Sequence, residues 1–167
     1  TDATADIAMT LMLMTCRRAG EGERMVRAGD WAGWHPTQLL GFHIGGKTLG
    51  IVGMGRIGKA IAKRAQAGFG MNIVFYNRSP GDDPGVPATQ LETLEAVLQT
   101  ADVVVLAVPA TPQTHHLISA DTLSAMRHES FLINIARGDI VDEAALIAAL
   151  ENGQIAGAGL DVYEFEP

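Results

Sequence analysis

The spacing of apolar and polar residues changes several times along the chain, and each change predicts an element. Residues 4–18 place apolar side chains at helical intervals, so we expect a helix there, with Asp2 or Thr4 as its N-cap. Apolar residues surround this helix nearly completely, which predicts that it is buried, for instance against another subunit. Residues 20–47 are rich in glycine and are expected to form an irregular arm.

From residue 48 onward, short apolar runs alternate with segments of helical spacing. Apolar runs of this kind are typical of strands that are buried on both faces of a parallel sheet. The alternation of strands and helices predicts a doubly wound α/β domain over residues 1–167. The expected strands are residues 48–53, 72–76, 102–108, 131–135 and 155–160, and the expected helices are residues 56–69, 91–99, 121–127 and 142–151, the last with Asp142 as its N-cap.

Composition narrows the classes of function. The 167 residues include 19 acidic and 12 basic side chains, a net charge of −7, which argues against a nucleic-acid-binding protein. The longest apolar run, Ile7–Cys16, is too short to span a membrane, and the first residues do not resemble a secretory signal. Cys16 is the only cysteine, so no internal disulfide is expected. These features predict a cytoplasmic protein with no membrane segment, nucleic-acid partner or metal site.

A glycine motif follows the strand expected at residues 48–53. The sequence GMGRIG at residues 53–58 has the G-x-G-x-x-G spacing, between a strand and a helix. Gly53 permits a tight turn, Gly55 lets the backbone approach a pyrophosphate, and Gly58 lets the helix pack on the strand. Free N–H groups and the helix dipole would then bind the phosphates. The motif predicts a Rossmann-like dinucleotide-binding domain; a purely structural turn is the alternative.

The choice between NAD and NADP depends on a residue at the end of the second strand, about twenty residues after the glycine motif. An NAD-selective domain carries Asp or Glu at this position. Asn77 stands there instead, followed by Arg78 and Ser79. Asn77 does not repel a 2′-phosphate, and Arg78 and Ser79 can donate hydrogen bonds to one. We therefore predict that NADPH is preferred over NADH. The alternative is that Arg78 is an ordinary solvated cation.

Charged residues follow the last two expected strands. Arg137 comes after residues 131–135, while Asp161 and Glu166 come after the final strand, at the edge where open α/β sheets bind ligands. A guanidinium can bind the carboxylate of a 2-oxo acid or polarise its carbonyl group. A carboxylate can raise the pKa of a nearby histidine that acts as an acid. Loop capping is the alternative role of Asp161 and Glu166.

Five segments together resemble the cofactor-binding domain of the D-isomer-specific 2-hydroxyacid dehydrogenases, and the resemblance covers the whole chain. Residues 31–41 and 77–79 are most similar to glyoxylate/hydroxypyruvate reductases. The five segments are TADIA at 4–8, the glycine motif at 53–58, VPATPQT at 108–114, NIARG at 134–138 and GLDVYEFEP at 159–167.

The resemblance implies roles for individual residues. Arg137 would be the substrate-binding catalytic arginine, and Glu166 the partner of the catalytic histidine. Thr4 would approach the nicotinamide, although a helix cap is an equal alternative for it. The remaining implied cofactor contacts are Asp161 and the backbone of Ile135 at the carboxamide, Arg56 and Ile57 over the pyrophosphate, and Val108, Pro109 and Thr114 along the adenosine and ribose.

The chain departs from the family pattern in two respects. The family's catalytic histidine would lie beyond Pro167, and its substrate domain is missing. None of the five histidines replaces the catalytic one, and the adjacent His115 and His116 need not face the same way, so no metal pair is expected. We therefore expect a fragment that binds dinucleotide but turns over poorly or not at all.

Assembly and alternative functions follow from the same resemblance. The family dimerises through this domain, and the first helix and an arm bearing Trp31 and Trp34 fit such an interface. A non-catalytic dinucleotide sensor, like the corepressors that resemble these dehydrogenases, remains an alternative to the enzyme. The fold alone would also allow adenosylhomocysteine hydrolases or alanine dehydrogenases, but the NIARG segment and the final Glu-Pro argue against them.

Overall fold

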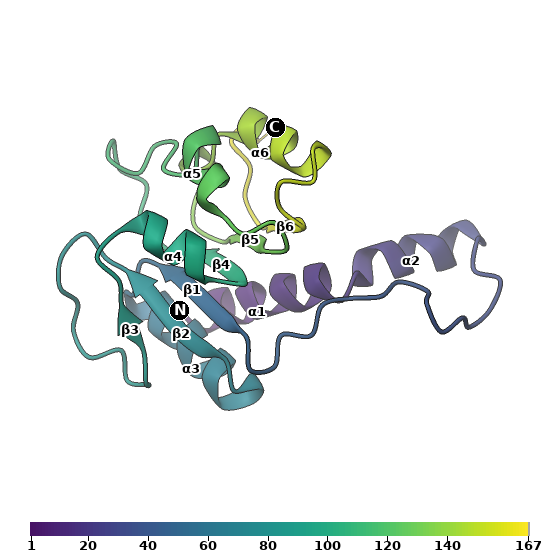
Figure 1. Cartoon of the computed structure of the whole chain (residues 1–167), viewed down its shortest axis with the longest axis horizontal. Helices are drawn as coiled ribbons and strands as arrows, with labels where there is room; N and C mark the ends of the chain where they lie inside the picture. Colours follow the sequence, from purple (N-terminus) through teal and green to yellow (C-terminus); the bar gives the residue numbers. More distant parts are fainter. Residues whose placement is uncertain (167) are drawn as a thin grey trace.

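A computed structural model describes residues 1–166 and contains one six-stranded sheet (Figure 1). All its strand pairs are parallel, in the order β3-β2-β1-β4-β5-β6. The chain builds outward from β1 to β3 and then returns to build β4 to β6 on the other side of β1, so the predicted doubly wound fold is confirmed. The strands are β1 Thr48–Val52, β2 Asn72–Tyr76, β3 Thr89–Gln90, β4 Val103–Leu106, β5 Phe131–Asn134 and β6 Gly157–Leu160.

Helices cover both faces of the sheet and divide the core into two clusters. Val103 and Val105 of β4 join the cluster under α1 and α3, whereas Val104 and Leu106 join the cluster under α4, α5 and α6. The strand is therefore buried on both faces, as its unbroken apolar run predicts. The helices are α1 Asp2–Cys16, α2 Ala19–Ala28, α3 Arg56–Phe69, α4 Leu94–Thr100, α5 Ala120–Ala125 and α6 Glu143–Glu151, with a short 3₁₀ helix η1 at Gly138–Ile140.

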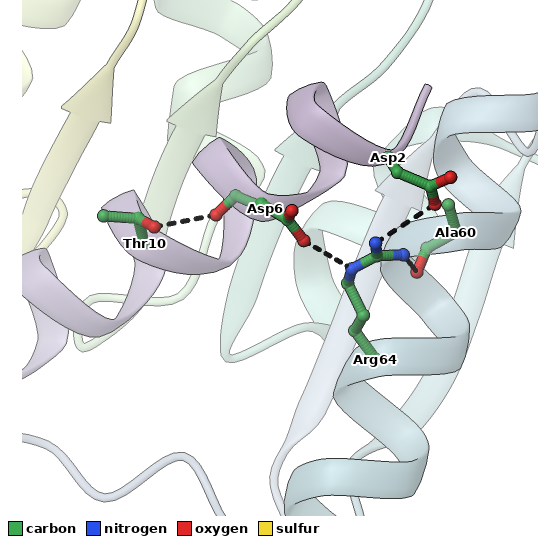
Figure 2. Close-up of polar contacts among 5 residues, drawn as sticks. All are labelled: Asp2, Asp6, Thr10, Ala60 and Arg64. Atoms are coloured by element: carbon green, nitrogen blue, oxygen red, sulfur yellow. Dashed lines mark hydrogen bonds and ion pairs between the residues drawn. The ribbon is translucent and has the colours of Figure 1, made fainter.

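Arg64 of α3 ties the first two turns of α1 to the domain (Figure 2). Its Nε donates to Asp6 Oδ1 at 2.8 Å, and its Nη2 donates to Asp2 Oδ1 at 3.1 Å. The third guanidinium nitrogen, Nη1, donates to the carbonyl of Ala60 at 3.1 Å. These contacts fix the helix turn that carries Thr4, which is half-buried.

The ends of several elements differ from the expected ones. Asp2 and Thr4 lie inside α1, whose N-cap is Thr1, so neither is the cap. The helix expected from residue 91 begins at Leu94, because the hydroxyl of Thr93 accepts from the N–H of Ala96 at 3.1 Å. The two-residue β3 was not expected. Asp142 does cap α6, since its Oδ1 accepts from the N–H of Ala145 at 3.0 Å.

The arm contains one more helix than expected, α2, where the sequence predicts irregular chain throughout residues 20–47. Arg18, with φ of 56°, separates α1 from α2, and Gly29, with φ of 76°, ends α2. No residue of α2 is buried. Figure 1 shows α2 and the chain that follows it reaching away from the sheet. Within residues 1–166, no helix has the length and apolar character needed to cross a membrane.

Candidate functional site

Five strands end in line along one edge of the sheet. Their register sets the final residues opposite one another: Val52, Tyr76, Leu106, Asn134 and Leu160. The next residues therefore form a row along the carboxyl edge, where open α/β sheets bind ligands: Gly53, Asn77, Ala107, Ile135 and Asp161. Segments far apart in the sequence thus bring the glycine motif, Asn77, Ile135 and Asp161 to one edge.

The glycine loop has the shape that phosphate binding requires. Gly53 has φ of 99°, and a Cβ there would lie 2.7 Å from the carbonyl oxygen of Ala107. A Cβ on Gly58 would lie 2.3 Å from the carbonyl oxygen of Gly53, so α3 can approach the loop only with glycine at this position. At Gly55, in contrast, a Cβ would have no neighbouring atom within 4 Å. No side chain caps the start of α3, so its first N–H groups can receive an anion.

Asn77 closes the loop from the neighbouring strand. Its Oδ1 accepts from the N–H of Met54 at 2.7 Å. Because a backbone N–H can only donate, this contact fixes the orientation of the amide and leaves Nδ2 as a donor. Arg78 and Ser79 are exposed, and the side chain of Gln90 holds the loop by donating to the carbonyl of Ser79 at 3.3 Å. Residues 77–79 thus offer donors and no carboxylate.

The residues predicted to line the adenosine side lie in the loop after β4. Val108 packs against the glycine loop, since its Cγ1 would be 2.8 Å from a Cβ on Gly53. Thr114 donates to the carbonyl of Pro109 at 2.8 Å and accepts from the N–H of Thr111 at 2.8 Å. The hydroxyl of Thr114 therefore stabilises this loop internally. Pro109 is exposed.

The side chain of Asn134 holds the turn that carries Arg137. Asn134 is buried at the end of β5; its Nδ2 donates to the carbonyl of Arg137 at 2.9 Å, and its Oδ1 accepts from the N–H of Ala136 at 3.0 Å. The guanidinium of Arg137 is exposed, with Nη1 2.6 Å from the carbonyl of Ala136. Sequence reasoning missed Asn134; a polar residue that ends an apolar strand was the available signal.

Gly138 brings the Arg137 turn against the segment that follows β6. A Cβ on Gly138 would lie 1.9 Å from the carbonyl oxygen of Tyr163 and 2.4 Å from the nitrogen of Glu164. Glu166, in the same segment, accepts from the N–H of Tyr163 through Oε1 at 3.1 Å, and its side chain is exposed. The structure thus brings together the two segments that carry Arg137 and Glu166.

Four more predicted residues lie at the start of α3 and at the ends of β5 and β6. Arg56 and Ile57 occupy the first turn of α3, with Arg56 exposed, and Ile135 is buried at the end of β5. Asp161 is exposed, and its N–H donates to the carbonyl of Asn134 at 3.0 Å. No side-chain hydrogen bond within residues 1–166 joins Thr4 to the rest of the predicted site.

A second pair of titratable residues lies beside the site and was not predicted. Nε2 of His116 is 2.6 Å from Oε1 of Glu164. This hydrogen bond raises the pKa of His116 above its ordinary value and lowers the pKa of Glu164. The rings of His115 and His116 are stacked with centroids 4.0 Å apart, and no group of three side chains in residues 1–166 could hold a metal ion.

The family model described as "D-isomer specific 2-hydroxyacid dehydrogenase, NAD binding domain" matches residues 9–167. The chain belongs to this family. A glyoxylate reductase of Pyrococcus horikoshii is 50% identical over 172 residues, which cover 100% of this chain and 51% of that protein. The expected resemblance to 2-hydroxyacid dehydrogenases, and to glyoxylate reductases among them, is confirmed.

Solved structures agree with this family assignment. A D-isomer-specific 2-hydroxyacid dehydrogenase from Polaromonas superposes with a TM-score of 0.96 at 44% identity, covering 100% of this chain and 52% of that one. A D-lactate dehydrogenase from Lactobacillus jensenii, solved with NAD⁺, superposes with a TM-score of 0.85 at 34% identity, covering 97% of this chain and 48% of that one. The chain is an NAD-binding domain of the family and spans about half the length of the relatives it matches.

Proposed function

We propose that residues 1–167 are the cofactor-binding half of a two-domain reductase that reduces a small 2-oxo acid, glyoxylate to glycolate or hydroxypyruvate to the D-2-hydroxy acid. The observation that carries this proposal is that the residues following five strands line one edge of the sheet. There, the uncapped start of α3 lies along the same edge as the turn of Arg137 and the segment of Glu166. The extra length of the relatives supports a second, substrate-binding part.

Each segment of the edge has a task in the proposed reaction. The first N–H groups of α3, at Arg56 and Ile57, bind the pyrophosphate, and the bound nicotinamide supplies the hydride. Asp161 and the backbone of Ile135 hold the carboxamide, while Thr4 flanks the nicotinamide. The guanidinium of Arg137 binds the substrate carboxylate and stabilises the negative charge that develops on the oxo oxygen.

The proposed reaction also needs a proton donor for the alkoxide. We propose that a histidine in the remaining length of the protein donates the proton to the alkoxide. Glu166 would pair with that histidine and raise its pKa, so that it stays protonated near neutral pH. The exposed carboxylate of Glu166, held through the N–H of Tyr163, is placed to meet such a partner.

NADPH is proposed as the preferred cofactor. An aspartate at position 77 would accept from the ribose hydroxyls and repel a 2′-phosphate. Asn77 instead uses its oxygen on the N–H of Met54 and keeps Nδ2 as a donor. Arg78 and Ser79 are exposed beside it and add a cation and a hydroxyl. Val108, Pro109 and Thr114 are proposed to line the adenosine side.

The assembly is proposed to be a homodimer in the cytoplasm, formed through this domain. No residue of α2 in the arm is buried, and the side chain of Trp34, further along the arm, is 83% exposed. Such aromatic side chains are typical of protein interfaces. A single cysteine allows no internal disulfide, which fits a reducing compartment. Burial raises the pKa of the Cys16 thiol to about 12 and leaves it unreactive.

The test uses the protein encoded by the complete reading frame around codons 1–167. With NADPH and glyoxylate we expect turnover, and Arg137→Met should lower kcat/KM by roughly 100-fold or more while NADPH still binds. Lys63→Met, an exposed cation on α3, is the matched control and should leave turnover unchanged. NADPH binding without reduction of any 2-oxo acid by the wild type would favour a dinucleotide sensor instead.

A further inference from the structure

Glu164 joins three segments that surround the proposed reaction edge. Its Oε1 contacts Nε2 of His116 at 2.6 Å, and its Oε2 accepts from the N–H of Glu143 at 3.3 Å. In return, Oε2 of Glu143 accepts from the N–H of Glu164 at 2.9 Å. The Glu164 side chain is only 15% exposed, so both its oxygens are committed to partners within the fold. One carboxylate thereby connects the loop after β4, the start of α6 and the segment after β6.

His116 is itself fixed by its backbone. It adopts the left-handed region with φ of 47°, which is uncommon for a residue other than glycine. Its N–H donates to the carbonyl of Asp139 at 2.8 Å, and its ring stacks on that of His115. Asp139 is two residues from Arg137. Backbone strain of this kind persists only where the surroundings hold the residue in place.

The two attachments of His116 reach the two segments that meet at Gly138. The backbone of His116 binds the turn of Arg137 at Asp139, and its ring binds the segment of Glu166 at Glu164. Gly138 itself packs directly on the backbone of Tyr163. We propose that His116, Glu143 and Glu164 form a clamp that positions Arg137 relative to Glu166 in the reaction proposed above, and that the clamp is tightest with His116 protonated.

The charges around His116 favour its protonated form. Glu164 faces it directly, Asp142 at the start of α6 and Asp139 of η1 add negative charge nearby, and Glu143 lies on the far side of Glu164. His115 is a basic group that stacks on the ring, with centroids 4.0 Å apart. Neutral His116 could still donate a hydrogen bond from Nε2, but the ion pair is lost. The clamp is therefore expected to loosen as pH rises, without opening completely.

The first test is a titration of the 167-residue chain followed by NMR. The His116 imidazole should titrate above the ordinary pKa of 6.5, and Glu164→Gln should return the pKa toward that value. The amides of Glu143 and Glu164, whose N–H groups donate within the clamp, should lose protection from hydrogen exchange in the same variant. His128→Gln, at an exposed histidine, is the control and should leave both measurements unchanged. An ordinary His116 titration in the wild type would overturn the clamp.

The second test measures kcat and KM across pH in the complete protein. His116→Gln and Glu164→Gln should lower kcat by roughly 10- to 100-fold, through misplacement of Arg137 and Glu166, with NADPH affinity unchanged. They should also remove the fall of kcat that follows His116 deprotonation. Variants that lose only thermal stability, and keep kcat and its pH profile, would show a purely structural pair and refute positioning.

The outcomes also separate this inference from the proposed function on which it rests. If the wild-type protein binds NADPH but reduces no 2-oxo acid, the proposed reductase activity is wrong. The positioning of Arg137 for that reaction then falls with it, whereas the titration and exchange measurements still decide whether the clamp exists. If the wild type is active and both variants match it, the clamp alone is rejected.

Discussion

Gly55 and Gly58 belong to one motif, yet the surroundings of their Cβ positions differ completely. Gly58 is essential to packing, because any Cβ would overlap the carbonyl of Gly53. Gly55 has backbone angles that other residues adopt, with φ of −83°, and nothing lies near its Cβ position. Folding therefore requires glycine at position 58 but not at position 55, where only a ligand would need the space.

A methyl group at position 55 should separate binding from stability. Gly55→Ala is expected to leave thermal unfolding unchanged and to weaken NADPH binding by about tenfold or more, a loss of roughly 1.4 kcal/mol. Gly68→Ala is the matched control on the same helix, since its Cβ also meets nothing; it should bind normally and gain up to about 1 kcal/mol of stability. Equal NADPH affinity in wild type and Gly55→Ala would contradict a pyrophosphate at this loop.

Gly138 provides the opposite case. Its Cβ would lie 1.9 Å from a backbone oxygen, which cannot move as a side chain can. Gly138→Ala should therefore lower the free energy of unfolding by about 3 kcal/mol, measured by urea denaturation. Retained stability would mean that the turn of Arg137 and the segment after β6 are not in the close contact described.

At the scale of elements, the His116–Glu164 pair gives stability a definite pH dependence. The raised pKa of His116 adds stability that is full below the ordinary value of 6.5 and is lost as pH rises through the raised pKa. The lowered pKa of Glu164 adds stability that is full above the ordinary value of 4.5 and is lost as pH falls through the lowered pKa. The wild type should thus exceed Glu164→Gln in thermal stability most clearly between pH 4.5 and 6.5.

Thermal unfolding of both proteins from pH 3 to pH 9 measures this difference. Glu164→Gln keeps the size of the side chain but removes the charge and one of two acceptors. The part of the difference that varies with pH therefore reports the charge, whereas a constant part reports the lost hydrogen bond. A difference in melting temperature that stays constant across the range would show that the pair contributes no pH-dependent stability.

The elements that the sequence predicted are those that bury apolar side chains on the sheet. β4 and α3 have long, regular patterns, and the structure places them within one or two residues of the prediction. α2 was missed because it buries nothing and contains two glycines, so neither pattern nor propensity distinguished it from irregular chain. The start of α4 was misplaced because Thr93 was not recognised as a cap.

Prediction of the site had a similar limit. The glycine loop was recognisable because its spacing has a direct geometric meaning, and the strand ends placed Asn77 and Asp161 on the correct edge. His116 and Glu164 were missed because they lie 48 residues apart in the sequence. Asn134 was missed although its partners, Ala136 and Arg137, are close in sequence, because its part in holding the turn was not recognised. Only the folded chain shows which of the closely spaced carboxylates, Glu164 or Glu166, bonds to His116 and which remains exposed.

At the scale of the whole molecule, the exposed apolar side chains of the arm predict that it packs against another protein chain. Figure 1 shows α2 and the chain after it extending from the domain. Large apolar side chains of this arm are exposed, among them Trp31, Trp34 and Leu40. We expect the chain to be a dimer of about twice its 17.7 kDa at micromolar concentration, measured by light scattering. A double variant, Trp31→Ser with Trp34→Ser, should be monomeric and remain folded. A monomeric wild type would contradict dimerisation through this domain.

Binding of the dinucleotide is what the proposed reaction requires of this chain. The most direct measurement is a fluorescence titration of the 167-residue chain with NADPH and with NADH at physiological salt. The donors at residues 77–79 predict that NADPH binds about 10- to 100-fold more tightly than NADH, and that Arg78→Ala removes most of this preference. Equal affinity for the two cofactors would contradict the NADPH preference, and binding of neither would contradict the central claim that this edge of the sheet is a dinucleotide site.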